Sequence, residues 1–562
     1  MVDMGTSAQT HTNRGGTRCR RKRAVVAVGL ALAVGLGAAG YSLTLGSDED
    51  ERIEPKGAAP GPCLDTPQEV LQRLRRGYLP KRSGDVLAVE RFPNQFGTRH
   101  AAPWPYTQDI PLVLYGPGFI RPGFSSDKNV TLADVAPTFA ELLEFDGLGE
   151  RDGRSLSEAL LPPDRRNGVP RLILTLVWDG GGDNMLEQWP DSWPNLKSLI
   201  AESASFGNAT VGSSPSITPS THATLGTGYF PSSHGLTDVP VRRNGKMIDS
   251  WEKKSPRNLK VETLADLWDR ANGNEPLIGL LARDSWHAGM MGHGSHLEGG
   301  DKDLSVLDAL GRLEFTSNTK HYSFPSYASS FEGLEEAVQE VDLRDGEADR
   351  AWLGHPMNMD GGIRETPAWS IFQTQRLFEI LEAESFGQDD VPDLFFTNYK
   401  PTDLTGHSYN LVEPEVKQNL EEQDRQLKVI VEGLDDLVGR DNYVLALTAD
   451  HGVTPYPELT GGWSIVTREL TKDLERRFNT AMPERELVTA NRGYQFFFNR
   501  KVLRANNITF EDISAFIRNY RLHENATDVD RLPDRFKERL NERIYLTAMS
   551  GRELELPACR PD

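Results

Sequence analysis

Four short polar segments of the chain carry residue types that suit the binding of metal ions. They contain Asp179, the Ser/Thr/Pro-rich run at 215–222 with Thr218, Asp403 with His407, and Asp450 with His451. Together they supply carboxylates, imidazoles and a hydroxyl, a mixture suited to borderline-hard cations such as Zn²⁺. The set therefore indicates a centre for two divalent metal ions, although each segment alone is weak evidence.

Each segment also has a plainer interpretation. An Asp-His pair after a strand is often a cap or a hydrogen-bonded pair, and two residues four apart can share a helical face by chance. Thr218 stands just before a predicted helix, where it could serve only as an N-cap. The presence of all four segments, in order and beside predicted strand ends, favours a shared site.

Four apolar runs are predicted to be buried strands of an α/β fold. They span residues 111–115, 171–178, 393–398 and 443–448. The first two have the continuous apolar pattern of parallel strands covered on both faces. The last three are followed by Asp179, Asp403 and Asp450. Because open α/β sheets bind ligands beyond the carboxyl ends of their strands, we expect these side chains along one edge of a central sheet.

The composition excludes several classes of protein. The chain has 562 residues, with 62 Lys and Arg against 82 Asp and Glu, and a net charge of −20. An acidic surface disfavours a nucleic-acid polymer as partner, because phosphate backbones need a basic face. A small phosphorylated substrate stays compatible with this charge, since a bound divalent cation reverses the local field. Three cysteines are too few for a disulfide scaffold or a zinc ribbon.

The first fifty residues predict a membrane anchor. A basic cluster at 18–23 precedes an apolar run at 24–46, and acidic residues follow at 48–51. A run of about 23 residues spans roughly 30 Å of hydrocarbon. The basic cluster predicts a single-pass membrane protein with a cytoplasmic N-terminus and an extracytoplasmic catalytic domain. A cleaved signal peptide ending near Ala38 and Ala39 is the alternative.

The remainder of the chain divides by composition and pattern. Helical patterns at 470–478 and 513–520 lack a polar strand end and predict an accessory subdomain. The predicted order is a basic tail (1–23), a transmembrane helix (24–46), a Pro/Gly-rich linker (47–62), an N-terminal segment (63–163), a main catalytic domain (170–458) and the accessory subdomain (459–562).

On these motifs the chain resembles the alkaline phosphatase superfamily, in the branch with a threonine nucleophile. That branch comprises phosphate-irrepressible alkaline phosphatases and nucleotide pyrophosphatase/phosphodiesterases. The resemblance implies a three-layer sandwich around a mixed, mostly parallel sheet, with Thr218 as the nucleophile and two divalent metal ions, expected from their ligands to be zinc. It assigns one metal to Asp179, Thr218, Asp450 and His451, and the other to Asp403, His407 and one further histidine.

The family has its last metal-binding histidine after the Asp-His-Gly motif, but here only His523 follows His451. Residues 97–118 and 132–138 resemble the family's C-terminal quarter instead. The chain is therefore predicted to be circularly permuted, with residues 63–163 equivalent to that quarter and His100 as the missing ligand. An ordinary chain order, with His523 as the ligand and His100 in an exposed loop, is the alternative.

The predicted permutation also gives a role to two cysteines. Cys63 and Cys559 stand at opposite ends of the exported part, and the termini of a domain often lie close together. We therefore expect a disulfide between them in an oxidising compartment, while Cys19 stays reduced on the cytoplasmic side.

The resemblance implies hydrolysis of phosphoric esters through a phospho-threonine at Thr218. Monoesterases of the family grip phosphate with a Lys-x-Arg pair, which is missing here; the candidate substrate contacts are Arg283, Trp286 and His287. The loss of this pair favours diesters or phosphonates, which carry less charge, although the sequence does not decide between phosphomonoesters and phosphodiesters or pyrophosphates. The lack of a sulfatase motif disfavours sulfate esters. An inactive, membrane-tethered binding protein of the same fold is the alternative function, and the oligomeric state is left open.

Two further groups near Trp286 have competing interpretations. Met290 and Met291 could form an apolar wall beside a leaving group, but buried packing is the stronger expectation. His287, His293 and His296 suggest another metal site only weakly, because no carboxylate or cysteine flanks them at ligand spacing.

Overall fold

A nine-stranded mixed sheet forms the centre of the computed structural model, which describes residues 62–63, 65–309, 312–358 and 362–559. The chain divides into residues 1–54 and 55–562, and all described residues lie in the second unit. The predicted transmembrane helix at 24–46 lies outside the described residues. Within the described residues, no helix combines the length and the apolar character that crossing a bilayer requires.

The middle of the sheet consists of five adjacent parallel strands. In sheet order they are β11 (Leu304–Asp308), β10 (Ile278–Ala282), β15 (Asp393–Tyr399), β5 (Leu172–Trp178) and β16 (Tyr443–Thr448). Residue Ile173 of β5 lies beside Leu394 on one side and Val444 on the other. The strands predicted at 171–178, 393–398 and 443–448 are therefore confirmed, as is an α/β fold.

The strand predicted at 111–115 also belongs to this sheet, but it does not run parallel to its neighbours. It forms β2 (Leu112–Tyr115), which pairs antiparallel with β16 and with β6 (Ala204–Phe206). The expected parallel direction was wrong, because an apolar run shows that both faces are covered and carries no information on direction. The sheet ends at β3 (Phe124–Ser126) beyond β6 and at β12 (Phe315–Thr316) beyond β11.

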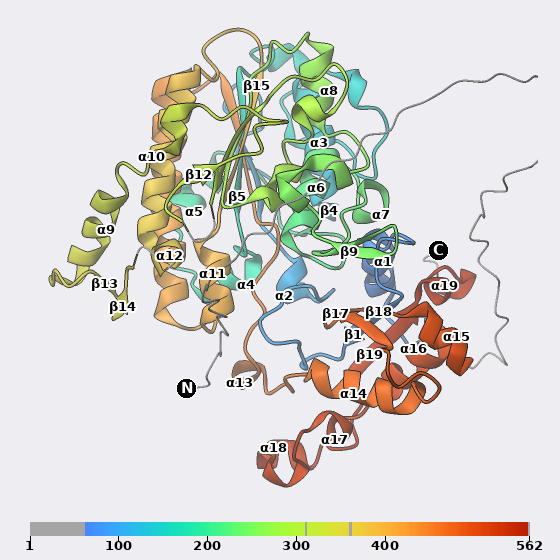
Figure 1. Cartoon of the computed structure of the whole chain (residues 1–562). Coiled ribbons are helices and arrows are strands. Elements are labelled where there is room, and N and C mark those ends of the chain that lie inside the picture. Colours follow the sequence, from blue (N-terminus) through green and yellow to red (C-terminus); the bar gives the residue numbers. More distant parts are fainter. Residues whose placement is uncertain (1–61, 64, 310–311, 359–361, 560–562) are drawn as a thin grey trace, which may run out of the picture. The chain divides into compact units, whose positions relative to one another are not determined.

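Helices cover both faces of the sheet, which gives three layers (Figure 1). One face packs against α5 (Pro194–Ala201), α9 (Leu334–Asp342), α10 (Pro367–Glu384) and α12 (Pro414–Leu434). The other face packs against α3 (Val135–Leu142), α6 (Thr218–Thr227) and α8 (Leu264–Ala271). Along β5, Leu174 and Leu176 point to the first face and Ile173 and Val177 to the second, as the alternation of a strand requires.

A second sheet lies beside the sandwich and joins residues from both ends of the described chain (Figure 1). Its order is β17 (Val488–Asn491), β18 (Gln495–Phe498), β1 (Val86–Glu90) and β19 (Tyr545–Ser550). Helices α14 (Thr467–Phe478) and α16 (Phe510–Asn519) pack on it around a separate core. The sequence predicted these helices but not the strands, nor that β1 of the 63–163 segment would lie between strands of the 459–562 segment.

Short elements connect these parts. The helices are α1 (Gln68–Gly77), α2 (Pro105–Gln108), α4 (Asp183–Gln188), α7 (Pro231–His234), α11 (Pro401–Ser408), α13 (Pro457–Thr460), α15 (Arg500–Asn506), α17 (Leu522–Asn525), α18 (Asp534–Lys537) and α19 (Gly551–Leu554). The strands are β4 (Val130–Thr131), β7 (Ala209–Thr210), β8 (Val241–Arg243), β9 (Lys246–Ile248), β13 (Ala351–Trp352) and β14 (His355–Pro356).

A disulfide joins Cys63 to Cys559, with 5.0 Å between their Cα atoms and 496 positions between them in sequence. Both cysteines are buried in a small apolar cluster with Leu71 of α1, Met549 of β19 and Leu554 of α19. The two ends of the described chain are thus held together by a covalent bond and by apolar packing.

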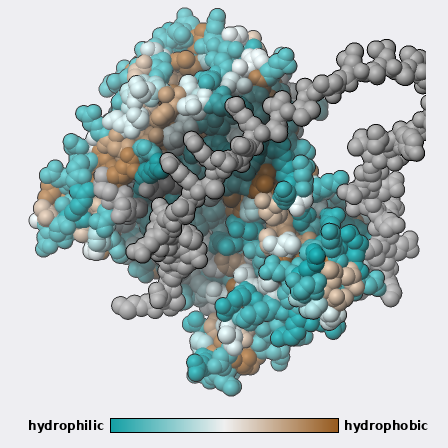
Figure 2. Space-filling view, in the orientation of Figure 1, coloured by the Kyte–Doolittle hydropathy of each residue, from teal (hydrophilic) through white to brown (hydrophobic). Residues whose placement is uncertain are grey.

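The surface of this unit is mainly hydrophilic on the face drawn in Figure 2. The large apolar side chains that are exposed in the described part of the chain come from separate elements; Phe92, the most exposed of them at 54%, precedes α2, whereas Val429 is on α12. Scattered exposed apolar residues are ordinary on a folded protein and need no partner to explain them.

Candidate metal centre and nucleophile

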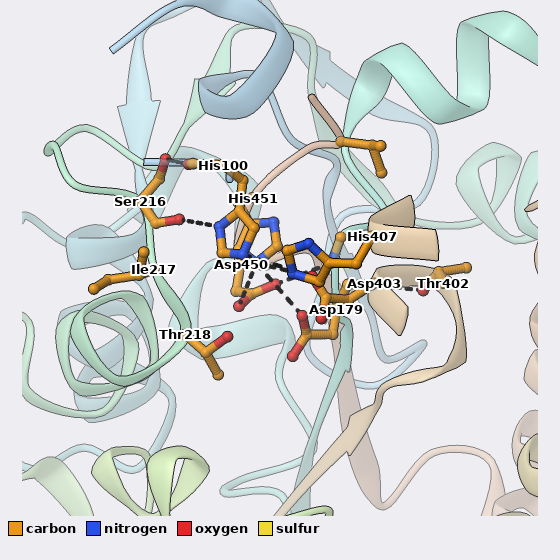
Figure 3. A network of polar contacts seen from close by, with 12 residues as sticks. His100, Asp179, Ser216, Ile217, Thr218, Thr402, Asp403, His407, Asp450 and His451 are labelled. Carbon is orange, nitrogen blue, oxygen red and sulfur yellow. Dashed lines mark hydrogen bonds and ion pairs between the residues drawn. The ribbon is translucent and has the colours of Figure 1, made fainter. Parts of the chain in front are cut away.

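Three adjacent strands deliver the predicted carboxylates to one edge of the large sheet (Figure 3). Asp179 directly follows β5, and Asp450 with His451 follows β16. Asp403 and His407 lie on α11, which begins two residues after β15 ends. Since β15, β5 and β16 are parallel neighbours, their carboxyl ends meet, and these five side chains converge as expected.

Gly180 makes this convergence possible. Its φ of +71° lies in the left-handed region, and a Cβ at this position would come within 3.0 Å of the Cα atom of Asp403. The Gly180 N–H donates a hydrogen bond of 3.2 Å to Oδ1 of Asp450. The glycine after Asp179 therefore lets α11 approach the end of β5 and orients the Asp450 carboxylate.

Thr218 is the first residue of α6 and faces the same centre (Figure 3). Ile217, and not Thr218, occupies the N-cap position, so an N-cap role for the threonine hydroxyl is wrong. The side chain of Thr218 lies at the positive end of the α6 dipole, where negative charge is favoured. Thr218 is 4% exposed, and the site can therefore hold its hydroxyl in a water-poor environment.

His100 joins the centre from the loop between β1 and α2. Its Nδ1–H donates to the carbonyl oxygen of Ser216 at 2.7 Å, and its Nε2 lies 3.6 Å from Oδ1 of Asp403. Its ring stacks on that of His451 with centroids 3.4 Å apart and lies 5.3 Å from that of His407. The antiparallel direction of β2 explains this position: the chain enters the sheet at the edge where the parallel strands end.

The donor atoms form two groups that fit divalent cations. In each group the ligand atoms lie within 4.8 Å of one another; the groups are His100, Asp403 and His407, and Asp179, Asp450 and His451. Oδ2 of Asp450 and Nε2 of His451 are buried and have no hydrogen-bond partner. Buried acceptors that receive no hydrogen bond are costly unless a cation binds them.

The backbone hydrogen bonds of the imidazoles and their charge state also suit metal binding. Nδ1–H of His451 donates to the carbonyl oxygen of Gly452 at 3.0 Å, which leaves the Nε2 lone pair toward the centre. Burial lowers the pKa of His451, and it lowers the pKa of His100 well below its usual value. Neutral imidazoles are the form that binds metal.

The carboxylates of the centre have opposite pKa shifts. Burial, together with the nearby Asp179 carboxylate, raises the pKa of Asp450 to about 7. Burial also opposes the ionisation of Asp403, but the Lys400 ammonium and the imidazoles of His407 and His100 outweigh it and hold its pKa well below its usual range. Closely packed acids of this kind are typical of a site that binds cations.

Two residues at the end of β15 contact the centre and were not predicted. The Lys400 ammonium lies 2.8 Å from Oδ1 of Asp179 and 2.8 Å from Oδ2 of Asp403. Asn398 donates from Nδ2 to the other oxygen of Asp179 at 2.9 Å. The only sequence signal for either residue was its place beside Asp403, because a lone lysine or asparagine has no ligand spacing.

The three candidate substrate contacts, Arg283, Trp286 and His287, differ in their surroundings. His287 is fully buried; its Nδ1 lies 3.3 Å from Nε2 of His222, and these two histidines form a third possible metal group with Asp179. Trp286 packs at the margin of a core cluster. Arg283 has a buried Nε without a hydrogen-bond partner.

Other histidines and methionines identified from the sequence lie away from the centre. Met290 and Met291 are fully buried in the core, so the packing interpretation holds. His293 pairs with Asp266 at 2.7 Å. His523 is exposed on α17, where Nδ1 contacts the carbonyl oxygen of Leu540 at 2.8 Å.

Comparison with known proteins shows the family to which the chain belongs. Residues 173–549 match the family Type I phosphodiesterase / nucleotide pyrophosphatase. The chain is 23% identical over 416 residues to alkaline phosphatase PafA of Elizabethkingia meningoseptica, which covers 64% of this chain and 74% of that protein. It is 24% identical over 404 residues to a calcium-transporting ATPase of Myroides odoratus, 62% of this chain and 72% of that protein. The crystal structure of wild-type PafA superposes with a TM-score of 0.49 at 18% identity, over 68% of this chain and 84% of that one.

Proposed function

This chain is a member of the type I phosphodiesterase / nucleotide pyrophosphatase family, and we propose that it hydrolyses phosphoric esters with Thr218 as nucleophile. The observation that carries the proposal is the meeting of a buried threonine hydroxyl with two groups of metal-binding side chains at one sheet edge. A hydroxyl beside two cation sites is the arrangement needed for in-line attack on phosphorus.

Two divalent ions, proposed as zinc, would supply Lewis acidity when bound to the two donor groups. The chain's own residues then have separate tasks. Thr218 attacks phosphorus through Oγ, and its Oγ–P bond forms as the bond to the leaving oxygen breaks. The N-terminus of α6 stabilises negative charge at Oγ. Water then hydrolyses the phospho-threonine and restores the hydroxyl.

The position of His100 supports the proposal that the chain is circularly permuted. β2 lies two strands from β5 in the same sheet, and the loop before it brings His100 to Asp403. In this proposal, residues 63–163 supply the metal-binding histidine that the resemblance assigns to the family's C-terminal quarter. His523 lies on α17 and contacts the carbonyl oxygen of Leu540, and among the described residues no hydrogen bond or ion pair joins it to the centre.

The substrate class is tested by comparing turnover of several esters by the full-length chain. A phosphomonoester (p-nitrophenyl phosphate), a phosphodiester (bis-p-nitrophenyl phosphate) and ATP are offered with added zinc and again with excess chelator. We expect turnover of at least one ester and its loss on chelation. If the chain binds two zinc ions and still hydrolyses none of the three esters, a binding protein with this fold would be favoured instead. Full activity in chelator would exclude the metal mechanism.

We also propose that residues 24–46 anchor the enzyme in a membrane with the catalytic unit on the extracytoplasmic side. The support is the apolar run behind a basic cluster. Alkaline carbonate extraction of membranes, followed by protease treatment of intact cells, tests it. Release of the chain by carbonate would contradict the anchor, and full protection from protease would contradict the orientation.

A further inference from the structure

We propose that Lys400 is a catalytic residue of this centre, whose ammonium holds the Thr218 oxygen and stabilises the negative charge that this oxygen carries during attack. The proposal rests on the proposed function and assigns a role to a residue that none of the motifs contains. In the step concerned, the Oγ–P bond forms and the P–O bond to the leaving group breaks. The leaving oxygen takes the electron pair, the hydroxyl proton passes to water, and Lys400 keeps its own protons.

The first support is the set of contacts that the ammonium makes. Nζ of Lys400 lies 3.2 Å from Oγ1 of Thr218, in addition to its ion pairs with Asp179 and Asp403 at 2.8 Å each. Two of its three N–H donors are used in hydrogen bonds to Asp179 and Thr218, and the ion pair with Asp403 adds a third oxygen. The cation is therefore fixed between one carboxylate of each donor group and the nucleophile.

The second support is the way the backbone holds this side chain. Lys400 is the N-cap residue of α11, directly after β15, and Pro401 follows at the first helical position. The hydroxyl of Thr402 donates to the carbonyl oxygen of Asp179 at 2.6 Å, which fastens the start of α11 to the end of β5. Lys400 itself is only 4% exposed. Its ammonium is thus held by the same elements that place the ligands, and little reorganisation is needed on reaction.

The third support is that the two carboxylate oxygens of Asp403 have different partners. Its Oδ2 binds Lys400, whereas its Oδ1 faces the imidazole nitrogens of His407 and His100 at 3.4 and 3.6 Å. The carboxylate can therefore bind a metal through Oδ1 while it keeps the lysine through Oδ2. Lysine and metal do not compete for one oxygen of Asp403, so removal of the ammonium should leave this donor group able to bind its ion.

The negative charge of the site explains what the Lys400 ammonium would stabilise. The centre contains the carboxylates of Asp179, Asp403 and Asp450, and a phosphoric ester is also an anion. Arg283, the other cation predicted near the site, makes no hydrogen bond or ion pair with Asp179, Asp403 or Thr218 in the described structure. A fixed positive charge at the nucleophile lowers the energy of the attacking oxygen in a water-poor site.

The test substitutes Lys400→Met, which removes the charge and keeps the length, in the full-length chain. We expect kcat for p-nitrophenyl phosphate to fall by about 10²-fold or more, the size found when one stabilising donor is removed. The zinc content by mass spectrometry should stay at the wild-type value. The rate at which phospho-threonine appears in a rapid quench should fall by the same factor as kcat. Lys472→Met is the matched control, because Lys472 makes an exposed ion pair with Glu469 at 2.9 Å and should change neither quantity.

Three outcomes would overturn the proposal. Wild-type kcat in Lys400→Met, with Thr218→Ala inactive, would leave the proposed function standing and remove Lys400 from it. Loss of zinc in proportion to activity would show that Lys400 assembles the donor groups and does not act on Thr218. Absence of turnover by the unaltered chain would remove the proposed function and this role together. Should Lys400→Met fail to fold, Lys400→Gln, whose neutral side chain is one atom shorter, is measured instead, and the same fall in kcat at unchanged zinc content is expected.

Discussion

At the scale of single residues, the centre is built from side chains whose two polar ends have different partners. His100 and His451 each give Nδ1–H to a backbone carbonyl and turn Nε2 inward. Such hydrogen bonds fix the tautomer and the ring orientation before a cation arrives. Residue types, together with the resemblance to the threonine-nucleophile branch of the alkaline phosphatase superfamily, predicted both histidines as metal ligands. Lys400 escaped prediction because its role depends on distances between two strand ends, which a single sequence position does not encode.

Thr218→Ala should abolish turnover while the zinc content stays nearly unchanged. The nucleophile is lost, which typically costs on the order of 10³-fold or more in kcat, but the Asp and His ligands remain. Thr221→Ala is the matched control on the same helix, since its hydroxyl donates only to the carbonyls of Ile217 and Thr218 and should affect stability by about 1 kcal/mol. Kinetics and metal analysis of both variants measure the difference. Near-wild-type turnover by Thr218→Ala would exclude Thr218 as the nucleophile.

His100→Ala should resemble His407→Ala, with one zinc ion bound more weakly and turnover reduced. Both imidazoles face Oδ1 of Asp403, at 3.6 and 3.4 Å. His523→Ala, an exposed histidine far from this group, serves as the control and should keep wild-type kinetics and zinc affinity. Titration with a competing chelator gives the affinities. An essential His523 together with a dispensable His100 would restore an ordinary chain order.

At the scale of elements, direction decides which strand ends can meet. The apolar runs predicted β2, β5, β15 and β16, because continuous burial leaves a clear pattern. The direction of β2 could not be predicted from the sequence pattern, because a strand's direction depends on the end of the sheet that the preceding loop reaches. The strand β1 was missed for a related reason: its five residues are short, and its partners β18 and β19 lie some four hundred positions away.

Gly180→Ala should weaken metal binding more than its backbone cost alone explains. An alanine at φ +71° costs roughly 1–2 kcal/mol, and its Cβ would also press on the Cα atom of Asp403 at 3.0 Å. Gly245→Ala carries the same backbone cost at φ +73°, with nothing within 4 Å of its Cβ. The two variants should therefore lose similar backbone stability, and only Gly180→Ala should lose zinc affinity and turnover. Equal effects on zinc affinity would show that the contact with α11 is unimportant.

At the scale of the whole molecule, one chain segment serves two sheets. Residues 86–90 form β1 in the second sheet, and residues 112–115 form β2 in the large one, with His100 between them. The main strands of the sandwich were predicted because they are apolar and followed by polar motifs, whereas the three-layer arrangement was implied by the family resemblance. It did not predict how the accessory part is organised, since charged amphipathic helices at 470–478 and 513–520 can pack on many surfaces. Only the structure shows that this part and the N-terminal segment fold together.

Loss of the disulfide should therefore destabilise the molecule at the junction of its first and last described elements. Cys63 and Cys559 close a loop of 496 positions, and a native disulfide typically contributes about 2–5 kcal/mol. The double variant Cys63→Ala/Cys559→Ala should melt at a lower temperature than the wild type without reductant, and reductant should not lower it further. Amide hydrogen exchange should rise first in α1 and α19, which share the apolar cluster of the two cysteines. Cys19→Ala is the control and should melt like the wild type. Two free thiols at 63 and 559 in a non-reducing peptide map, or a melting temperature unmoved by the double substitution, would show that packing alone holds the ends together.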